Sequence, residues 1–301
     1  MQRAAPGAPV FALMVLLCAV WGLQQVAIKL ALEGIGPLFQ VGLRSAVASV
    51  LVFGWARWRA VRLFEDDGSW WPGLIAGLFF ALEFVCIFVG LEYTGASRMV
   101  VFLYTAPCFT VLGLHWFVAG ERVTSRQAIG VALAFAGVVV AFADAAWRTT
   151  GADFSQRWIG DLLGVLAAIF WAASTVVVRG TVLARVHAAK TLLYQLVVSA
   201  VIVLPLSFLT GEAAVAAPTA TMLLALAYQA VVVAFASYLT WFWLLTKYLA
   251  NRLMVFSFLT PLFGVAFGVV LLGERMSAQF AIAALLVVAG IALVNAPARR
   301  T

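Results

Sequence analysis

The hydrophobic residues of this chain fall into long, nearly unbroken runs, separated by short segments rich in polar, charged, glycine and proline residues. About 20 helical residues span a bilayer core about 30 Å thick, because an α-helix rises about 1.5 Å per residue. The alternating pattern of a membrane β-barrel is absent, and helices satisfy their own backbone hydrogen bonds in lipid. The pattern predicts an all-α integral membrane protein with ten transmembrane helices, at residues 10–32, 38–56, 72–92, 97–118, 126–144, 159–180, 188–209, 220–246, 252–272 and 278–296.

A stretch of 21 residues occurs twice in the chain. Residues 120–140 and 273–293 share 8 identities at a shift of 153, and the windows before them, 96–107 and 250–261, match at a shift of 154. The polar segment 145–158 separates the copies, so we expect one repeat at 1–147 and a second at 148–301. Five helices per half is an odd number, so the second half must be inverted in the membrane. Inverted repeats are typical of secondary transporters, in which one half rocks against the other around a central site.

Composition supports a lipid environment and argues against several classes of protein. The chain is 65% hydrophobic and 10% charged, whereas soluble domains carry about 25% charged residues. The net charge of +7 comes from Lys and Arg scattered singly between apolar runs, without the basic stripe of a nucleic-acid-binding protein. The three cysteines lie inside apolar runs in no metal-ligand spacing, and no glycine-rich phosphate-binding loop is present. We therefore expect no nucleic-acid partner, no metal, no cofactor and no ATPase activity.

The distribution of positive charge predicts the orientation in the membrane. With the N-terminus inside, 13 Lys and Arg fall in inner segments and 4 in outer ones, while 2, Lys29 and Arg44, sit within helices. Because Lys and Arg are enriched in short cytoplasmic loops, we expect both termini in the cytoplasm. The first apolar run is longer than a signal-peptide core and is expected to be retained as a helix.

The repeated residues resemble a known family. Each half ends in a Gly-Glu-Arg turn and an Ala-Ile…Ala-Gly helix, the first helix carries Trp21-Gly22, and Pro107 and Pro261 precede the turns. In these features the chain is similar to the EamA domains of the drug/metabolite transporter superfamily, and within it to amino-acid exporters of the YddG type. The resemblance implies a ten-helix basket with a central cavity in the bacterial inner membrane. One departure is Ala283, where the pattern usually has the glycine that the first half keeps at Gly130.

Two symmetry-related helices carry polar residues at helical spacing. Trp21, Gln24, Gln25 and Lys29 share one face of the first helix, and at a shift of 150 the sixth helix has Trp171, Ser174, Thr175 and Arg179. Polar groups are costly against lipid, so both faces should point inward. Two interpretations of these inward faces are open. In the first they bind substrate, and in the second they join neighbouring helices by hydrogen bonds. Lys29 and Arg179 lie near helix ends, where a snorkelling role is an alternative.

Glu83 is the one acidic residue deep within an apolar run. Because an ionised carboxylate is costly there, it should be neutral, paired or hydrated. One interpretation is a carboxylate that couples protons or binds an amine, and the other is an ion pair with Lys29 or Arg44. Arg44 itself is a candidate partner for a substrate carboxylate or for a structural pair.

Further candidates lie on the fourth, eighth and ninth predicted helices. Tyr104 precedes Pro107 by three residues, and Tyr238 and Trp241 lie one turn apart, so these three aromatics are candidates for lining the pocket or for ordinary packing. Pro107 and Pro261 should kink their helices, as gating hinges or as simple curvature. Glu121 and Glu274 stand before predicted helices and are expected to cap them.

Taken together, these patterns favour a secondary transporter that exports amino acids or related small metabolites by alternating access. Alternative cargoes are organic cations, drugs or a phosphorylated metabolite. The alternatives from a different class are a membrane receptor and an integral-membrane enzyme. An enzyme would need a cluster of His, Asp or Glu at one membrane face, and the two histidines, His115 and His187, are isolated. The expected partners are a small-molecule substrate and the lipid bilayer, and the sequence leaves the oligomeric state open.

Overall fold

The computed structural model describes residues 7–94, 96–148, 156–213, 219–272 and 278–296. Within these ranges some side chains lie outside the description, among them those of Gln25 and Lys29. The described residues form helices and no sheet, and nine helical spans are long and apolar enough to cross a membrane. The tenth predicted span is a shorter apolar helix near the end of the chain. The predicted all-α, ten-helix membrane fold is therefore confirmed.

The first half contains five predicted spans, of which the fourth is built from two short helices. Its elements are α1 (Ala8–Leu32), α2 (Pro37–Trp58), α3 (Trp70–Tyr93), α4 (Ala96–Leu103), α5 (Ala106–Phe117) and α6 (Ser125–Arg148). The second half repeats this order with more interruptions. Its elements are α7 (Arg157–Gly180), the short 3₁₀-helix η1 (Val182–Ala184), α8 (Ala188–Leu209), α9 (Ala220–Ala227), η2 (Tyr228–Ser237), α10 (Tyr238–Lys247), α11 (Ala250–Met254), η3 (Val255–Phe258), α12 (Leu259–Leu272) and α13 (Ala278–Asn295).

The spans with interruptions are the fourth, eighth and ninth. Tyr104 and Thr105 separate α4 from α5, and Pro107 lies at the start of α5, where its missing N–H costs no helical hydrogen bond. In the ninth span the 3₁₀-helix η3 precedes Pro261, close to the start of α12. The middle of the eighth span is a π-helix, η2. Such segments inside longer helices are frequent at functional sites and hinges.

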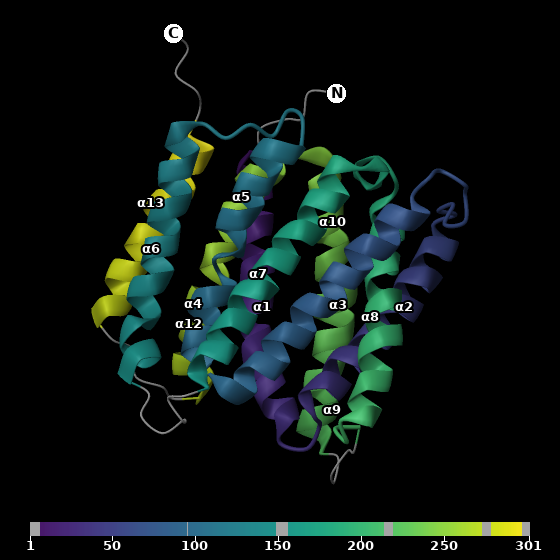
Figure 1. Cartoon of the computed structure of the whole chain (residues 1–301), viewed down its shortest axis with the longest axis horizontal. Coiled ribbons are helices and arrows are strands. Elements are labelled where there is room, and N and C mark those ends of the chain that lie inside the picture. Colours follow the sequence, from purple (N-terminus) through teal and green to yellow (C-terminus); the bar gives the residue numbers. More distant parts are fainter. Residues whose placement is uncertain (1–6, 95, 149–155, 214–218, 273–277, 297–301) are drawn as a thin grey trace.

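Contacts between the two halves follow the two-fold symmetry expected of an inverted repeat. The second span packs on the seventh (α2 with α8) and the fifth on the tenth (α6 with α13), so each helix meets its own counterpart. The contact of α1 with α12 is matched by that of α7 with α4 and α5, and the contact of α1 with α9 and η2 by that of α7 with α3. In Figure 1, α6 and α13 lie side by side, and α1 begins at the end of the bundle where α13 ends.

Glycine allows the fifth and tenth spans to approach closely. A Cβ atom added at Gly290 would lie 2.4 Å from the carbonyl oxygen of Gly130 and 2.7 Å from the backbone nitrogen of Ala134. A Cβ at Gly137 would lie 2.8 Å from the carbonyl oxygen of Ala283. These glycines therefore pack one helix of the chain against another, and the alanine at 283 leaves this packing intact.

The expected cap of α6 is formed by other residues than Glu121. The amide nitrogen of Gln127 donates to the hydroxyl of Thr124 at 3.3 Å, and that of Thr124 donates to the side-chain oxygen of Gln127 at 3.0 Å. This reciprocal pair is a capping box. Glu121 instead accepts hydrogen bonds from Ala250 N at 2.9 Å and Asn251 N at 3.3 Å, at the start of α11. Glu274 lies outside the described residues.

Arg179 is the buried partner of Glu121, so snorkelling does not apply to it. Its guanidinium donates to the Glu121 carboxylate and to the carbonyl oxygen of Leu245 at the end of α10. Both charged side chains are almost fully buried, at 0% and 2% exposure. The pair joins the loop between α5 and α6 to α7, α10 and α11.

Candidate substrate cavity

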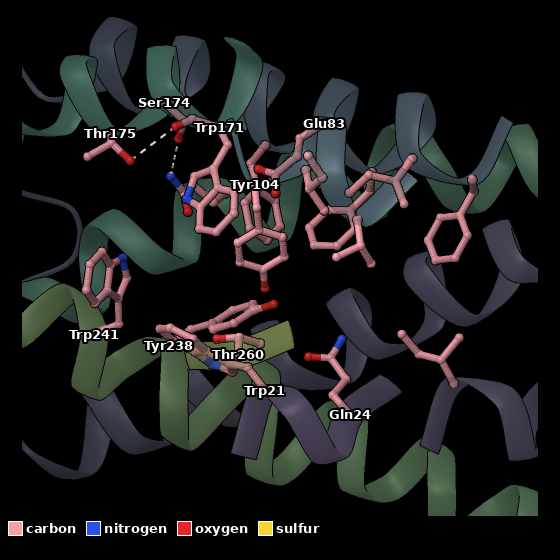
Figure 2. A pocket seen from close by; sticks show the side chains of 18 of the residues that line it. Trp21, Gln24, Glu83, Tyr104, Trp171, Ser174, Thr175, Tyr238, Trp241 and Thr260 are labelled. Carbon is pink, nitrogen blue, oxygen red and sulfur yellow. Dashed lines mark hydrogen bonds between the residues drawn. The ribbon is translucent and has the colours of Figure 1, made fainter. Parts of the chain in front are cut away.

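A cavity of about 230 Å³ lies inside the bundle, between helices of both halves. Figure 2 shows its labelled side chains in two groups that face each other. Glu83, Tyr104, Trp171, Ser174 and Thr175 come from α3, the break between α4 and α5, and α7. Trp21, Gln24, Tyr238, Trp241 and Thr260 come from α1, α10 and α12. The walls are thus built from spans 3, 4 and 6 and from spans 8, 9 and 1, which the repeat relates to one another.

The residues that the sequence singled out as substrate-binding come together in this cavity. Those lining it are Trp21, Gln24, Glu83, Tyr104, Trp171, Ser174, Thr175, Tyr238 and Trp241. The side chain of Gln25 lies outside the description. The inward direction of polar residues in lipid-spanning helices accounts for this grouping, and their role in binding is still a prediction.

Aromatic rings hold the wall around Trp21. Its indole lies 5.8 Å from the ring of Trp241 at an interplanar angle of 80°, and 6.4 Å from the ring of Tyr238 at 61°. The indole Nε1 donates a hydrogen bond of 2.9 Å to Ser237 Oγ, at the end of the π-helix η2. The Ser237 hydroxyl in turn donates to the carbonyl oxygen of Val233 at 2.6 Å. These edge-to-face contacts and hydrogen bonds fix the indole between the first and eighth spans.

The opposite wall has a matching aromatic pair. Trp171, the repeat counterpart of Trp21, meets Tyr104 edge-on with ring centroids 6.0 Å apart. Tyr104 lies at the break between α4 and α5, so the interruption before Pro107 places this ring at the cavity. Thr260, directly before Pro261, lines the cavity from the ninth span. Both helix interruptions thus border the cavity, and their action as hinges is a prediction.

A buried hydrogen-bond network fixes the polar part of the α7 wall. Gln195 Nε2 donates to Ser174 Oγ at 2.8 Å, and Ser174 Oγ donates to the carbonyl oxygen of Ala76 at 3.3 Å. The Thr175 hydroxyl donates to the carbonyl oxygen of Trp171, one turn earlier, at 3.1 Å. The side-chain oxygen of Gln195 has no hydrogen-bond partner among the described residues. An unpaired buried acceptor at a cavity is suited to a donor group of a ligand.

Glu83 contributes a carboxylate to the wall formed by α3. Its side chain is 8% exposed, and within the described part of the chain it has no hydrogen bond and no ion pair. Phe80, three residues before Glu83 along α3, and Phe84, directly after it, also line the cavity. Phe80 meets Tyr238 across the cavity at 6.1 Å, nearly perpendicular. The carboxylate therefore lies among aromatic rings.

Arg44 of α2 is not among the residues that line the cavity. Its guanidinium carbon is 4.4 Å from the centroid of the Phe84 ring, and the residue is 2% exposed. No ion pair joins it to Glu83 in the structure as described. The cation–π contact holds the charge against the ring face that Phe84 turns toward α2.

Several lining residues had no distinguishing signal in the sequence. Phe80, Phe84 and Thr260 lie in apolar runs where aromatic or hydroxyl residues face lipid, core or cavity equally well. Gln195 interrupts the apolar run 188–209, and that polar position was the available signal. The described residues contain no group of His, Cys, Asp and Glu that could hold a metal ion.

Comparison with known proteins places this cavity in a recognised fold. A solved crystal structure is similar with a TM-score of 0.80 over 93% of this chain and 94% of the other, at 21% identity. An uncharacterized transporter of Archaeoglobus fulgidus is 27% identical over 289 residues, covering 94% of this chain and 96% of that protein. A probable amino-acid metabolite efflux pump of Escherichia coli is 28% identical over 291 residues, covering 93% and 92%. A protein of the same description in Salmonella typhimurium is 27% identical over 293 residues, covering 93% and 92%.

The family evidence covers both halves of the chain. The sequence profile described as "EamA-like transporter family" matches residues 9–143 and again residues 158–296. Together these matches include most of the 301 residues. The chain therefore belongs to the EamA-like transporter family and is a multi-pass membrane transporter.

Proposed function

We propose that this transporter exports amino acids or related small metabolites across the bacterial inner membrane by alternating access. The observation that carries the proposal is the cavity between two symmetry-related walls, each of which contains helices from both halves. A site on a pseudo-two-fold axis can be exposed to either side when one wall moves relative to the other. We also infer that the repeat units are residues 1–147 and 148–301.

The size and lining of the cavity support a small, partly apolar cargo. Pockets for drug-sized ligands measure about 300–1,000 Å³, whereas this cavity measures about 230 Å³. A phosphorylated cargo would favour Lys or Arg at the site, and the described lining residues include no Lys, Arg or His. The probable amino-acid metabolite efflux pumps among the relatives support amino acids as cargo.

The proposed orientation in the membrane follows from the distribution of positive charge. Lys190, Arg185 and Arg179 lie at the bundle end where α2 and α7 end and α8 begins, with Arg57 and Arg59 at the end of α2. In short loops such residues favour the cytoplasmic side. We infer that this end faces the cytoplasm, together with the start of α1 and the end of α13 (Figure 1).

Pro107 and Pro261 are proposed as hinges of the two walls, because each helix interruption lies directly beside a cavity residue. Glu83 is proposed as the group that would carry a proton if transport is proton-coupled. It is the one acidic side chain among the described lining residues.

The test is transport by the purified protein in liposomes. Vesicles preloaded with one unlabelled amino acid are given the labelled form in counterflow, across a panel of amino acids, with and without a pH gradient. We expect neutral amino acids to accumulate, and vesicles without protein to show none. Transport of a lipophilic cation or a sugar phosphate, with no amino acid transported, would contradict the proposed cargo. A pH effect that is lost in Glu83→Gln would support a proton role for this carboxylate.

A further inference from the structure

The charges around the cavity are distributed asymmetrically. Of the described lining residues, Glu83 has the one acidic side chain, and none is Lys, Arg or His. The nearby cation, Arg44, is turned to the face of Phe84 and lies outside the lining. A zwitterionic amino acid in this cavity would meet a carboxylate for its ammonium group, and neutral side chains for its own carboxylate.

Aromatic rings line the same cavity as this carboxylate. Phe80 and Phe84 flank Glu83 on α3, with ring centroids 5.0 Å apart, and Tyr238 meets Phe80 from the opposite wall. Trp21 lies against Tyr238 on that wall. The faces of such rings attract cations, and they do so more strongly where water is excluded. A carboxylate among aromatic rings is chemically matched to a protonated amine.

The neutral groups of the cavity are suited to a weaker role. Gln24 of α1 and Trp171 of α7 line the cavity, and their side-chain N–H groups have no hydrogen bond to described residues. They are able to donate to a carboxylate, an amide or an ester alike. An ammonium group beside Glu83 would meet an opposite charge, whereas a ligand carboxylate would meet neutral donors alone, so the ammonium end of a ligand should dominate recognition.

We propose that the cavity recognises its cargo through a protonated amino group held by Glu83 and the surrounding rings, and that a free carboxylate on the cargo is not required. This inference rests on the proposed function, because it names the chemical class of the exported solute. The class is small primary amines with an apolar body, including amino acids and their amides or esters. The cavity volume of about 230 Å³ favours such small amines over drug-sized cations.

The test compares four compounds with one side chain and different charges. Phenylalanine, phenylalaninamide, phenethylamine and N-acetylphenylalanine are titrated by calorimetry into the full-length protein in detergent. We expect the amide and the amine to bind at least as tightly as phenylalanine, and N-acetylphenylalanine to bind at least tenfold more weakly than the amine. Binding of N-acetylphenylalanine as tight as that of phenethylamine, or no binding of phenethylamine, would overturn the proposal.

The carboxylate is tested with a matched pair of variants. Glu83→Gln should weaken phenethylamine binding by about tenfold or more, since the ammonium group of the ligand loses its negatively charged partner. Glu33→Gln, at the exposed end of α1, should leave binding unchanged. An unchanged affinity in Glu83→Gln would also overturn the proposal. If that variant does not fold, the comparison of the four compounds on the wild-type protein still decides.

The same compounds separate this proposal from the proposed function. Proteoliposomes that bind phenethylamine but transport none of the four compounds would contradict the transport function and leave the recognition site standing. Uptake of phenylalanine that N-acetylphenylalanine inhibits and phenethylamine does not would support amino-acid transport and overturn recognition by the ammonium group. Empty vesicles correct for passive entry of the neutral amine.

Discussion

The indole nitrogen of Trp21 donates a hydrogen bond of 2.9 Å to the hydroxyl of Ser237, 216 residues later in the chain. This bond joins the first helix of one half to the end of the π-helix in the other half. It lies at the cavity wall, where Trp21 also contacts Tyr238 and Trp241. The contact between the two repeats and the shape of the candidate site therefore depend on the same side chain.

Replacing Ser237 by alanine should destabilise the protein by about 1–3 kcal/mol, because the indole N–H loses its acceptor in a part-buried site. The matched control is Ser49→Ala in α2, whose hydroxyl donates to the carbonyl oxygen of Ala46 in its own helix. That change should cost less than about 0.5 kcal/mol. Thermal unfolding of both variants in detergent checks the difference. Equal stability of the two variants would show that the Trp21–Ser237 bond contributes nothing measurable.

Many of the cavity residues could be predicted from the sequence, because polar residues are rare in the membrane-spanning helices and two physical rules apply to each of them. Lipid forces polar side chains inward, and the repeat doubles each observation, so Trp21 and Trp171 were identified as a pair from sequence. The same rules carry no information on Phe80 or Phe84, because an aromatic residue in an apolar run is stable in lipid, in the core or at a cavity. Gln195 was detectable as a polar position, but its partner Ser174 lies on a different helix.

The position of Glu121 shows a second limit. A carboxylate before a helix predicts a local cap, and local spacing cannot reveal that the start of α11, about 130 residues later, offers two backbone N–H groups. The π-helix η2 is a further case, because no residue type in Tyr228–Ser237 specifies a wider helical turn. Such features arise from packing between distant segments, and they appear only once the fold is known.

The buried pair of Glu121 and Arg179 gives a second prediction. Glu121→Gln should destabilise the protein by about 3–5 kcal/mol, because it leaves the Arg179 guanidinium buried without its countercharge. The neighbouring substitution Arg122→Gln, at an exposed position, should change stability by less than about 0.5 kcal/mol. Chemical denaturation in detergent measures both.

A double variant tests the cause of that loss. If the cost arises from an uncompensated charge, Glu121→Gln combined with Arg179→Met should be more stable than the sum of the two single changes predicts. Additive losses in the double variant would instead indicate that Glu121 acts mainly through the backbone of Ala250 and Asn251.

The loop before α3 should confer a dependence of stability on acid pH. Hydrogen bonds from Lys190 first, and then from Ser69, lower the pKa of Asp67 to about 2. Asp67 therefore stays ionised in the folded protein down to a lower pH than in the unfolded chain, where its pKa is about 3.9. The resulting stabilisation is present above about pH 4 and is lost as the pH falls from about 4 to about 2.

Asp67→Asn should remove this dependence, and Asp66→Asn, at an exposed position, should retain it. Because the Asp67 side chain is 27% exposed, solvent screening limits the effect to about 1 kcal/mol. Thermal unfolding of the three proteins between pH 2 and 5 is the measurement. A wild-type protein and an Asp67→Asn variant that lose stability in parallel over this range would contradict the assignment.

The contact between α6 and α13 gives a prediction with an internal control. In Gly290→Ala the new methyl group would lie 2.4 Å from the carbonyl oxygen of Gly130 and 2.7 Å from the nitrogen of Ala134, and both are backbone atoms of the facing helix. Backbone cannot turn aside as a side chain does, so the two helices must separate. The expected cost is about 1–3 kcal/mol, as for overpacking of a tight interior.

Gly54→Ala in α2 is the matched control, because a Cβ atom there meets nothing within 4 Å. Alanine is favoured over glycine in a helix by up to about 1 kcal/mol, so this variant should be as stable as the wild type or more stable. The two substitutions add the same methyl group, but in thermal unfolding in detergent Gly290→Ala should lower the unfolding temperature and Gly54→Ala should leave it unchanged or raise it. Equal effects of the two substitutions would mean that α6 and α13 can separate without loss of stability. The close contact between these helices would then not be needed to hold the two halves together at this edge.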